Sequence, residues 1–572
     1  MTNKEIAQIL AQIAKILEVR NQEKNRFRII AYERASQTIG SLTNELSEIF
    51  ARGGRKALDE IDGVGESIAE KIEELLKTGR LKYLKEIQEE LPKTEVEFLR
   101  IPGIGPKMAV KLAEELKAKN IEDLKKKIEK GMADNLIKEK TRRNILRGIE
   151  ILGKLSDRLL ITEALPIAEE VVGYLKKNKY VQNIDYVGSL RRMKETIGDI
   201  DVVATSISPA KVIESFVSMP SVDHIISQGE SKSTIIHQKG VQVDLEIVPE
   251  NEYGSLLQHF TGSKEHNVAL RTLAQTKNKS VSEHGIKYDG KLHTFTAEKG
   301  VYEFLGLDEI PPELREDRGE IEAAAKHNLP KLVELTEIKG DLHVHSNWSD
   351  GHMTIEEIAT AGEKLGYEYI VISDHTVGLG IAHGLNEERL IARQKEIDSV
   401  QKNHPKIKLL SSVEVNIKAN GDLDIKDEML SSLDLVTASV HTSFHQDKET
   451  MTRRIIGAIN HPHVDIIGHP SGRIIGQREP YEVDWPEIFC AASKNKTALE
   501  ISAFPNRLDL ADFLVKDAAK FGVKFVINTD AHTKEHLNLM RFGVAVARRG
   551  WLQEENVINT LNFNGLIEWL NR

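Results

Sequence analysis

Apolar residues recur every three or four positions near the beginning of the chain, with Lys and Glu between them. This spacing puts them on one face of a helix. The positions are Ile6, Ile9, Leu10, Ile13, Ile16 and Leu17. The pattern predicts a helical region over residues 1–152, alternating strands and helices over 153–250, and a smaller mixed unit over 251–316. Pro311-Pro312 and the charged residues after them predict a linker.

The rhythm changes again from about residue 337, where short apolar runs alternate with helical segments. Such alternation is typical of a β/α barrel. Seven runs are strand candidates: 340–344, 369–373, 408–414, 434–440, 464–468, 498–502 and 523–529. We therefore expect a seven-stranded barrel at the C-terminal end.

Two acidic residues stand at the start of a strand candidate in the middle of the chain. Asp199 and Asp201 are two positions apart, so on a strand they share one face while the apolar residues around them face the core. The run 241–248 alternates in the same way and carries Asp244 among its polar positions. If the two strands are neighbours, the three carboxylates form a cluster, which proteins tolerate around divalent cations. The plainer alternative is a solvated turn.

One internal repeat is visible, because residues 58–72 return in similar form at 98–112. Each copy reads apolar-x-Gly-apolar-Gly and precedes a helical stretch. The glycines allow a tight turn whose free N–H groups, at a helix N-terminus, can hold a DNA phosphate without reading sequence. They are Gly63 and Gly65 in the first copy and Gly103 and Gly105 in the second. An ordinary helix packing unit is the alternative.

Histidine and acidic residues gather at or just after the carboxyl ends of the barrel's strand candidates, where barrel enzymes place their chemistry. One histidine near a strand is usually a satisfied core residue, but nine ligand-type residues in these places indicate metal binding. Imidazoles with carboxylates suit Zn²⁺, Mn²⁺ or Fe²⁺. The residues are His343, His345, Asp350, His375, Glu414, His441, His469, Asp530 and His532.

Composition and charge are those of an ordinary globular protein, since 40% of the 572 residues are apolar and 29% are charged. Cys490 is the only cysteine, which excludes a disulfide framework and a cysteine-based zinc site. No apolar stretch approaches the roughly 18 residues of a membrane span, so we expect a cytoplasmic protein. The net charge of −10 is uneven: residues 1–150 hold 30 Lys and Arg against 26 Asp and Glu, a balance that suits a phosphate backbone.

Residues 188–201 read GSLRRMKETIGDID. With Asp244, this segment resembles the palm of family X DNA polymerases, and the barrel motifs resemble the PHP (polymerase and histidinol phosphatase) domain that some members carry at the C-terminus. The resemblance spans almost the whole chain. It implies a multidomain fold: an all-α helix-hairpin-helix N-terminal region, an α/β (α+β) nucleotidyltransferase palm and thumb, and a distorted (β/α)7 PHP barrel. The implied boundaries are 1–82 and 83–152 for two helical DNA-binding domains, 153–250 for the palm, 251–316 for a nucleotide-selection subdomain, 317–336 for a linker and 337–572 for the PHP domain.

By this resemblance Asp199, Asp201 and Asp244 would hold two Mg²⁺ ions that activate a primer 3′-hydroxyl and stabilise charge on the α-phosphate. Gly188 and Ser189 would hold the triphosphate through backbone N–H groups and a hydroxyl in a turn. Arg192 and Gly198 complete this part of the motif, with Arg192 donating charge-assisted hydrogen bonds to the phosphates.

The segment 259–267 resembles the part of the family that packs against the incoming nucleotide. Phe260 and Gly262 would shape the sugar pocket, although Phe260 could equally be a core aromatic residue. Asn267 would contact the base edge and Arg271 the minor groove of the template. His259 stands where vertebrate members often carry Tyr, which leaves the strength of ribose exclusion open.

In the N-terminal region, Lys71 matches the family position that forms a Schiff base with an opened abasic sugar. Arg28 and Tyr32 match neighbours of the 5′-phosphate. A nucleophilic Lys needs a depressed pKa, and Glu66 and Glu70, close in sequence, would raise it. An exposed helix Lys without catalytic function is therefore an equal alternative to a lyase.

For the barrel, the resemblance implies that all nine residues hold up to three ions, Mn²⁺ or Zn²⁺, in a 3′–5′ exonuclease. Arg473 would assist the phosphate or lie as a surface residue in its loop. The chain as a whole is interpreted as a repair polymerase that fills short gaps and trims 3′ ends. Its expected partners are gapped or primer-template DNA and dNTPs, with no membrane, and we expect a monomer associated with the nucleoid.

Two other classes of function are weighed against this interpretation. A DNA-binding scaffold with decayed sites is disfavoured by the complete set of Asp and metal-ligand positions. A metal-dependent small-molecule phosphatase is disfavoured by the two helix-hairpin-helix copies, because a free metabolite needs no DNA clamp.

Overall fold

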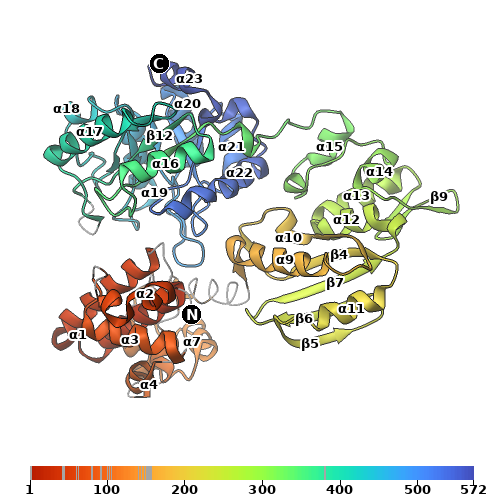
Figure 1. Cartoon of the computed structure of the whole chain (residues 1–572), viewed down its shortest axis with the longest axis horizontal. Coiled ribbons are helices and arrows are strands. Elements are labelled where there is room, and N and C mark those ends of the chain that lie inside the picture. Colours follow the sequence, from red (N-terminus) through yellow and green to blue (C-terminus); the bar gives the residue numbers. More distant parts are fainter. Residues whose placement is uncertain are drawn as a thin grey trace.

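The computed structural model describes residues 3–41, 46–59, 61, 63–78, 81–89, 93–98, 101, 104, 106–139, 141–143, 145–146, 149, 158–378 and 382–571. Three parts follow one another along the chain: N-terminal helices, a central domain built on one sheet, and a C-terminal barrel (Figure 1). This architecture confirms the predicted multidomain fold. Within the described ranges no helix is both long enough and apolar enough to cross a membrane.

The regular secondary structure described in the N-terminal part is all helical, as its apolar spacing predicts. Its helices are α1 (Asn3–Ser41), α2 (Leu46–Asp59), α3 (Glu66–Thr78), α4 (Lys82–Glu89), α5 (Lys93–Phe98), α6 (Pro106–Leu116) and α7 (Ile121–Glu129). They bury two separate apolar cores, one around Ile13 and Ile72 and one around Leu112 and Leu124. Each copy of the sequence repeat therefore belongs to its own small domain.

The first glycine turn lies between α2 and α3. Gly63 has a φ of 76°, a left-handed conformation that favours glycine, and Gly65 directly precedes α3. The second pair, Gly103 and Gly105, lies outside the described residues, although the helix that follows it, α6, begins at Pro106.

The central domain is a five-stranded sheet of strand order β2-β4-β7-β6-β5. Its strands are β2 (Val181–Tyr186), β4 (Ile200–Ser206), β5 (Val222–Gln228), β6 (Lys232–His237) and β7 (Gln242–Val248). Strands β4 and β7 are parallel neighbours, with Asp201 directly opposite Asp244. Two helices, α9 (Ile161–Leu175) and α11 (Pro209–Val217), pack on the face that buries Val202. The predicted pairing of the two Asp-bearing strands is therefore present.

A smaller unit continues the chain from the central sheet. It consists of α12 (Tyr253–Thr261), α13 (Lys264–Thr276), the antiparallel strands β8 (Ser280–Ser282), β9 (Gly285–Tyr288) and β10 (Lys291–His293), and α14 (Glu298–Phe304). The expected linker after it is a packed segment rather than a free spacer. It contains α15 (Glu320–Ala325), where the buried Glu320 carboxylate lies 2.6 Å from Nδ1 of His266, and the amide of Val333 donates to the carbonyl of Leu552 at 3.0 Å.

The barrel consists of two parallel sheets of strand order β11-β12-β13 and β14-β15-β16-β17-β18. Single bridges join them on both sides, between Val344 and Ala531 and between His375 and Glu414. The strands are β11 (Gly340–Val344), β12 (Tyr369–Ile372), β13 (Lys408–Ser411), β14 (Glu414–Asn416), β15 (Thr437–Ser439), β16 (Ile466–Ile467), β17 (Ala498–Ser502) and β18 (Phe525–Asn528). The principal helices around them are α16 (Ile355–Leu365), α17 (Glu387–Gln401), α19 (Lys448–Ile459), α20 (Trp485–Asn495), α21 (Asp512–Lys520) and α22 (Met540–Arg549).

All seven predicted strand segments are present, but the third is divided into β13 and β14. Arg393 from α17 is fully buried behind this break, where its guanidinium donates to the hydroxyl of Ser411 and the carbonyl of Ser412. The Ser412 carbonyl therefore bonds a side chain, and the strand is interrupted just before Glu414.

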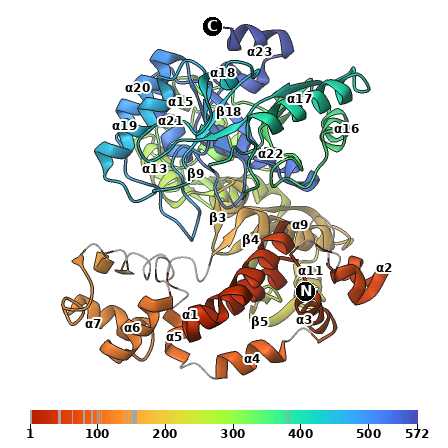
Figure 2. The same ribbon diagram turned by 90° about the vertical axis from the view of Figure 1, so that its left-hand side faces the viewer.

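The barrel and the central domain are in contact (Figures 1 and 2). One cluster of buried apolar side chains extends through both. Polar contacts reinforce it, including an ion pair of 2.7 Å between Arg473 of the barrel and Glu195 of the central domain. Arg473, expected as a phosphate ligand or a free surface residue, instead joins the two domains.

Candidate catalytic and metal sites

The first site, here called the carboxylate site, consists of Asp199, Asp201 and Asp244. Each can offer one oxygen such that the three atoms lie within 4.8 Å of one another. Asp199 stands just before β4 and is exposed, while Asp201 on β4 and Asp244 on β7 are half-buried. The parallel pairing of β4 with β7 thus produces the cluster that the alternation of both strands predicts.

The environment of this cluster favours cations. Burial, and after it the negative charges of Asp199 and Asp244, raise the pKa of Asp201 to about 7. Asp244 is held in place by two donors, the hydroxyl of Thr234 at 2.5 Å and the amide of Gln242 at 2.7 Å. A divalent cation would remove the repulsion that raises the pKa of Asp201, so the donor set fits a hard ion such as Mg²⁺.

Steric contacts explain why glycine occurs in the turn beside the cluster. Gly188 begins the short helix α10 (Gly188–Arg191) with a φ of 64°, and a side chain there would collide with the Asp201 carboxylate. Ser189 follows, half-buried, and Gly198 lies against the guanidinium of Arg158, which would stand 3.0 Å from an added Cβ. The backbone of the turn at Gly188 therefore lies directly against the Asp201 carboxylate.

Arg192 lies at the end of the same helix. Its guanidinium is not free for a phosphate, because it already binds acceptors within the protein. Its Nε is 2.9 Å from the Glu316 carboxylate, and its Nη1 donates to the carbonyl of Thr261 at 2.5 Å. An added Cβ at Gly262 would meet the same nitrogen at 3.1 Å, so this glycine leaves room for the guanidinium. Sequence reasoning missed Glu316 because it lies 124 positions away in the chain.

A small pocket of about 160 Å³ opens at the carboxylate site and is lined by Asp201, Asp244 and Phe260 among others. Lys232 also lines it, with its ammonium 5.8 Å from the centre of the Phe260 ring. This placement favours the pocket interpretation of Phe260 over that of a simple core residue. Lys232 is a further site residue, with no signal in the sequence other than its position on the strand beside Asp244.

The two other residues assigned to nucleotide and template lie near α12. Asn267 uses its amide within the protein, donating to the carbonyl of His259 at 2.7 Å and accepting from Gln258 at 2.9 Å. Arg271 is exposed, and its Nη2 lies 3.4 Å from Nδ1 of His259. Asn267 retains a second amide N–H and a second carbonyl lone pair for a base edge, and Arg271 is accessible as it stands.

The second site, here called the barrel site, comprises the nine residues His343, His345, Asp350, His375, Glu414, His441, His469, Asp530 and His532. Glu414 lies at its centre, only 1% exposed, with its carboxylate between 3.0 and 3.7 Å from ring nitrogens of five histidines. Three groupings of these residues have ligand atoms close enough to share an ion, and they overlap at His345 and His375. The structure thus assembles eight of the nine residues into metal-type groups, and His469 reaches Glu414 at 3.0 Å.

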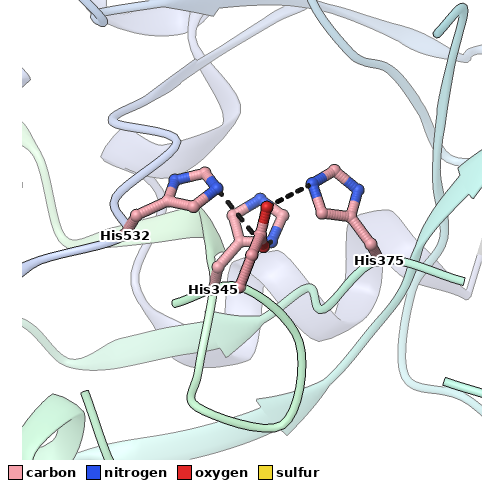
Figure 3. A group of neighbouring side chains, drawn as sticks. His345, His375 and His532 are labelled. Atoms are coloured by element: carbon pink, nitrogen blue, oxygen red, sulfur yellow. Dashed lines mark ion pairs between the residues drawn. The ribbon is translucent and has the colours of Figure 1, made fainter. Parts of the chain in front are cut away.

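One of these groups is drawn in Figure 3, where the rings of His345, His375 and His532 surround a carboxylate. That carboxylate belongs to Asp350, whose oxygens lie 3.8, 3.6 and 3.5 Å from the three rings. His345 leaves β11, His375 follows β12 and His532 follows β18, so neighbouring strands deliver them to one end of the barrel. This is the strand end at which the sequence predicts the chemistry.

The shifted pKa values of its histidines and its buried atoms without hydrogen bonds indicate that the barrel site binds cations. Burial opposes protonation of His532, but Asp350 and Asp530 raise its pKa to about 9, whereas burial together with His532 and His375 lowers the pKa of His345 to about 4. Within the described part of the chain, four buried atoms of the site lack a hydrogen-bond partner, namely Nδ1 of His345, His441 and His469 and Oδ1 of Asp350, while Nδ1 of His375 has only its ion pair with Glu414 at 3.0 Å. Such atoms are costly unless something binds them, and imidazole and carboxylate donors fit Mn²⁺ or Zn²⁺.

A layer of residues behind the ligands orients them, and sequence reasoning missed its main member. Glu500 on β17 is fully buried and lies 2.7 Å from Nδ1 of His343, while Asn528 donates to the same carboxylate at 2.9 Å. This leaves Nε2 of His343 for a metal, as ligand histidines usually require. The available signal was a lone acid in the otherwise apolar strand 498–502.

The N-terminal residues assigned to a lyase also lie together. Tyr83 connects them: it accepts a hydrogen bond from Arg28 at 2.5 Å, stacks with Tyr32 at 6.4 Å, and lies 5.0 Å below the Lys71 ammonium. Burial lowers the pKa of Lys71, although Glu70 acts in the opposite direction. Glu70 raises the pKa of Lys71 as expected, but desolvation outweighs it, so the net direction is downward.

Comparison with known proteins covers every part of this architecture. Four families match, with the residues given for each: helix-hairpin-helix domain (1–81), SAM-like helix-hairpin-helix tandem (95–148), DNA polymerase beta thumb (256–316) and PHP domain (341–503). The "DNA polymerase/3'-5' exonuclease PolX" of Bacillus subtilis (strain 168) is 36% identical over 578 residues, covering all of both chains.

Two further relatives match parts of the chain. The DNA polymerase lambda of Rattus norvegicus is 27% identical over 342 residues, covering 54% of this chain and 56% of the relative. A probable phosphatase of Thermoanaerobacter sp. (strain X514) is 33% identical over 233 residues, covering 38% of this chain and 89% of the relative.

Proposed function

This chain belongs to the family X DNA polymerases with a C-terminal PHP domain, and on that premise we propose which of its residues carry the two activities. It is a DNA polymerase with a 3′–5′ exonuclease. We assign the polymerase to the carboxylate site and the exonuclease to the barrel site. The observation that carries the assignment is the presence of two complete and separate ligand clusters on one chain.

At the carboxylate site, Asp199, Asp201 and Asp244 would hold two Mg²⁺ ions. When bound, these ions supply activation of the primer 3′-hydroxyl and neutralise charge on the α-phosphate. Thr234 and Gln242 fix the Asp244 carboxylate through two hydrogen bonds, so its position is set before the substrate arrives.

The nucleotide would lie between the α10 turn and the pocket wall. The backbone N–H groups of Gly188 and Ser189, the Ser189 hydroxyl and the Arg192 guanidinium would hold the triphosphate, and Gly198 would complete this nucleotide-binding motif. Phe260 and Gly262 would bound the sugar, Asn267 the base edge, and Arg271 the template minor groove. The pocket beside Phe260 and the exposure of Arg271 support these roles.

At the barrel site, the nine ligands would hold up to three Mn²⁺ or Zn²⁺ ions. When bound, these ions supply an activated water and stabilise the departing 3′-oxygen. The Glu414 carboxylate pairs with the surrounding histidines, including His375 and His441, and Glu500 fixes the tautomer of His343. Six of the nine ligand residues are buried, which limits the access of bulk water to the ions.

The biological task that unites both sites is the filling of short gaps in DNA repair. The helix-hairpin-helix turns would grip DNA phosphates without reading sequence, at Gly63 and Gly65 and again at Gly103 and Gly105. The partners are then gapped or primer-template DNA and dNTPs. We further propose a monomer that works in the cytoplasm on the nucleoid.

The decisive assay is a labelled primer on one-nucleotide-gapped DNA, with and without dNTPs, in Mg²⁺ and then in Mn²⁺. Extension with dNTPs and shortening without them are expected from the same preparation. A protein that only shortens the primer would contradict the polymerase assignment. A protein that hydrolyses small phosphomonoesters but leaves both DNA ends unchanged would favour the phosphatase alternative.

A lyase on abasic DNA is a second candidate function, because Lys71 is desolvated and lies beside Arg28 and Tyr32. A lowered pKa leaves more of the amine neutral and able to attack a sugar aldehyde. Lys71→Ala is expected to abolish borohydride trapping on abasic DNA. The matched control is Lys77→Ala on the same helix, whose ammonium is paired with Glu73 at 2.6 Å and whose loss should leave trapping unchanged. Equal trapping by both variants would contradict the assignment.

A further inference from the structure

A row of charged side chains connects the proposed nucleotide site with the barrel. Arg192 of the central domain pairs with Glu316 at 2.9 Å, and Glu316 is also 3.1 Å from Arg549 at the end of barrel helix α22. Arg549 in turn pairs with Asp512 at the start of α21 at 2.6 Å. The barrel therefore reaches within one side chain of the arginine assigned to the triphosphate.

Arg549 also contacts the backbone that carries Arg192. Its Nη1 donates to the carbonyl of Arg192 at 2.8 Å, directly at the C-terminal end of α10. The side chain of Arg549 is only 3% exposed, so this hydrogen bond is formed away from solvent. The contact fixes the end of the glycine turn as well as the charge beside it.

The Glu316 carboxylate pairs with other cations besides Arg192. Burial raises the pKa of Glu316, but Arg549, Lys194 and Arg192 together hold it below its ordinary value. Arg192 has a second acceptor in the carbonyl of Thr261 at 2.5 Å. A triphosphate must compete with Glu316 for the Arg192 guanidinium, and the positive charge of Arg549 weakens that competitor.

We propose that Arg549, a residue of the barrel domain, is a positioning residue for nucleotide binding at the carboxylate site. Its hydrogen bond to the Arg192 carbonyl fixes the backbone at the end of α10. Its ion pair with Glu316 weakens the attraction between Glu316 and the Arg192 guanidinium. The inference rests on the proposed role of Arg192 as a triphosphate ligand. In addition to carrying the exonuclease, the barrel domain would then help to position a nucleotide-binding residue of the polymerase site.

The test compares two neighbouring arginines of α22 in the full-length protein. Arg549→Gln removes the contacts to Glu316 and to the Arg192 carbonyl, so we expect the KM for dNTP to rise about tenfold, with a smaller change in kcat. Arg548→Gln is the matched control, because Arg548 pairs with Glu313 and Glu334, and among the described residues it forms no hydrogen bond or ion pair with Arg192. Its KM should equal that of the unmodified protein, and both variants should shorten primers at the normal rate.

Two more variants separate this inference from the function on which it rests. Glu316→Gln removes the competing charge, so Arg549→Gln should raise the KM much less in that background, as a double-mutant cycle reports. Arg549→Lys keeps the charge and should recover part of the affinity. If Arg192→Ala raises the KM but Arg549→Gln does not, the inference fails while the role of Arg192 stands. If Arg192→Ala has no effect on the KM, the proposed triphosphate site itself is wrong.

Discussion

The carboxylate site and the barrel site differ in how much of a cation's surroundings the chain provides. Three aspartates form the first, and one of them, Asp199, is exposed. Nine side chains form the second, and His343 and Glu414 within it are at most 1% exposed. Mg²⁺ usually completes its shell with water and substrate phosphates. From this difference we expect the central domain to complete its metal site only together with the nucleotide, and the barrel to hold ions by itself.

The largest expected effect breaks the carboxylate site alone. Asp199→Ala should lower nucleotide incorporation on gapped DNA by about a thousandfold or more, because one ligand of the ions is lost. Shortening of the primer without dNTPs should continue at the normal rate. Asp223→Ala, an exposed change on strand β5 of the same sheet, is the control and should leave both activities intact. Normal extension by Asp199→Ala would refute the palm assignment.

The reciprocal change breaks the barrel site alone. His343→Ala combined with His345→Ala removes two buried ligands, so primer shortening should fall by about a thousandfold while extension persists. The measurement is the same gapped-primer assay without dNTPs. Shortening that survives in this double variant would place the exonuclease elsewhere in the chain.

A smaller effect is expected from the residue that orients His343. Glu500→Gln keeps the shape but removes the charge 2.7 Å from Nδ1, and the metal affinity of the barrel should fall about 10- to 100-fold. Competition with a coloured chelator measures this affinity. Glu449→Gln, on the exposed face of α19, is the control. An unchanged affinity in Glu500→Gln would show that Glu500 is only a structural residue.

The dependence of the carboxylate site on Mg²⁺ should change with pH. The folded protein without metal keeps a proton on Asp201 up to about pH 7, far above the ordinary pKa of a carboxyl group. Mg²⁺ must displace this proton at lower pH, so its apparent affinity should fall about tenfold for each pH unit below 7 and level off above 7. Mg²⁺ titrations of nucleotide incorporation between pH 6 and 8.5 test this. A flat profile would contradict the raised pKa.

The smallest effect concerns the support of Asp244. Thr234→Val preserves the shape but removes the hydrogen bond of 2.5 Å to the carboxylate, and incorporation should decrease by about three- to tenfold. Thr276→Val removes a comparable hydroxyl that bonds only to the carbonyl of Leu273 on its own helix. It should leave incorporation unchanged, and equal losses in both variants would indicate a general effect of stability.

The sequence predicts the elements whose pattern is local and fails where distant residues meet. The alternation around Asp201 and Asp244 gives the face of each strand on which the carboxylate lies, although the pairing of the two strands comes from the structure, and the strand ends locate the barrel ligands. The division of strand 408–414 was not predictable, because it depends on Arg393 from another helix. The partners of Arg192 and Arg473, Glu316 and Glu195, were likewise beyond reach, since ion pairs between domains leave no periodic signal.

The pKa of Lys71 is a second property that neighbouring charges in the sequence do not predict. Glu66 and Glu70 stand close to it in the sequence, which suggests a raised pKa. In the structure Glu70 points toward Arg55 at 3.9 Å, while burial near Tyr83 dominates the environment of the amine. Proximity along the chain gave the correct sign for the effect of Glu70 on the pKa of Lys71, but only the fold reveals the larger effect of desolvation.

The most direct test of the central contrast is anomalous diffraction from crystals of the full-length protein, soaked in Mn²⁺ and then washed, without nucleotide. Our account predicts strong peaks among the nine barrel ligands and none between Asp199, Asp201 and Asp244 until a nucleotide is added. Strong peaks between the three aspartates before nucleotide is present, or an empty barrel, would contradict it.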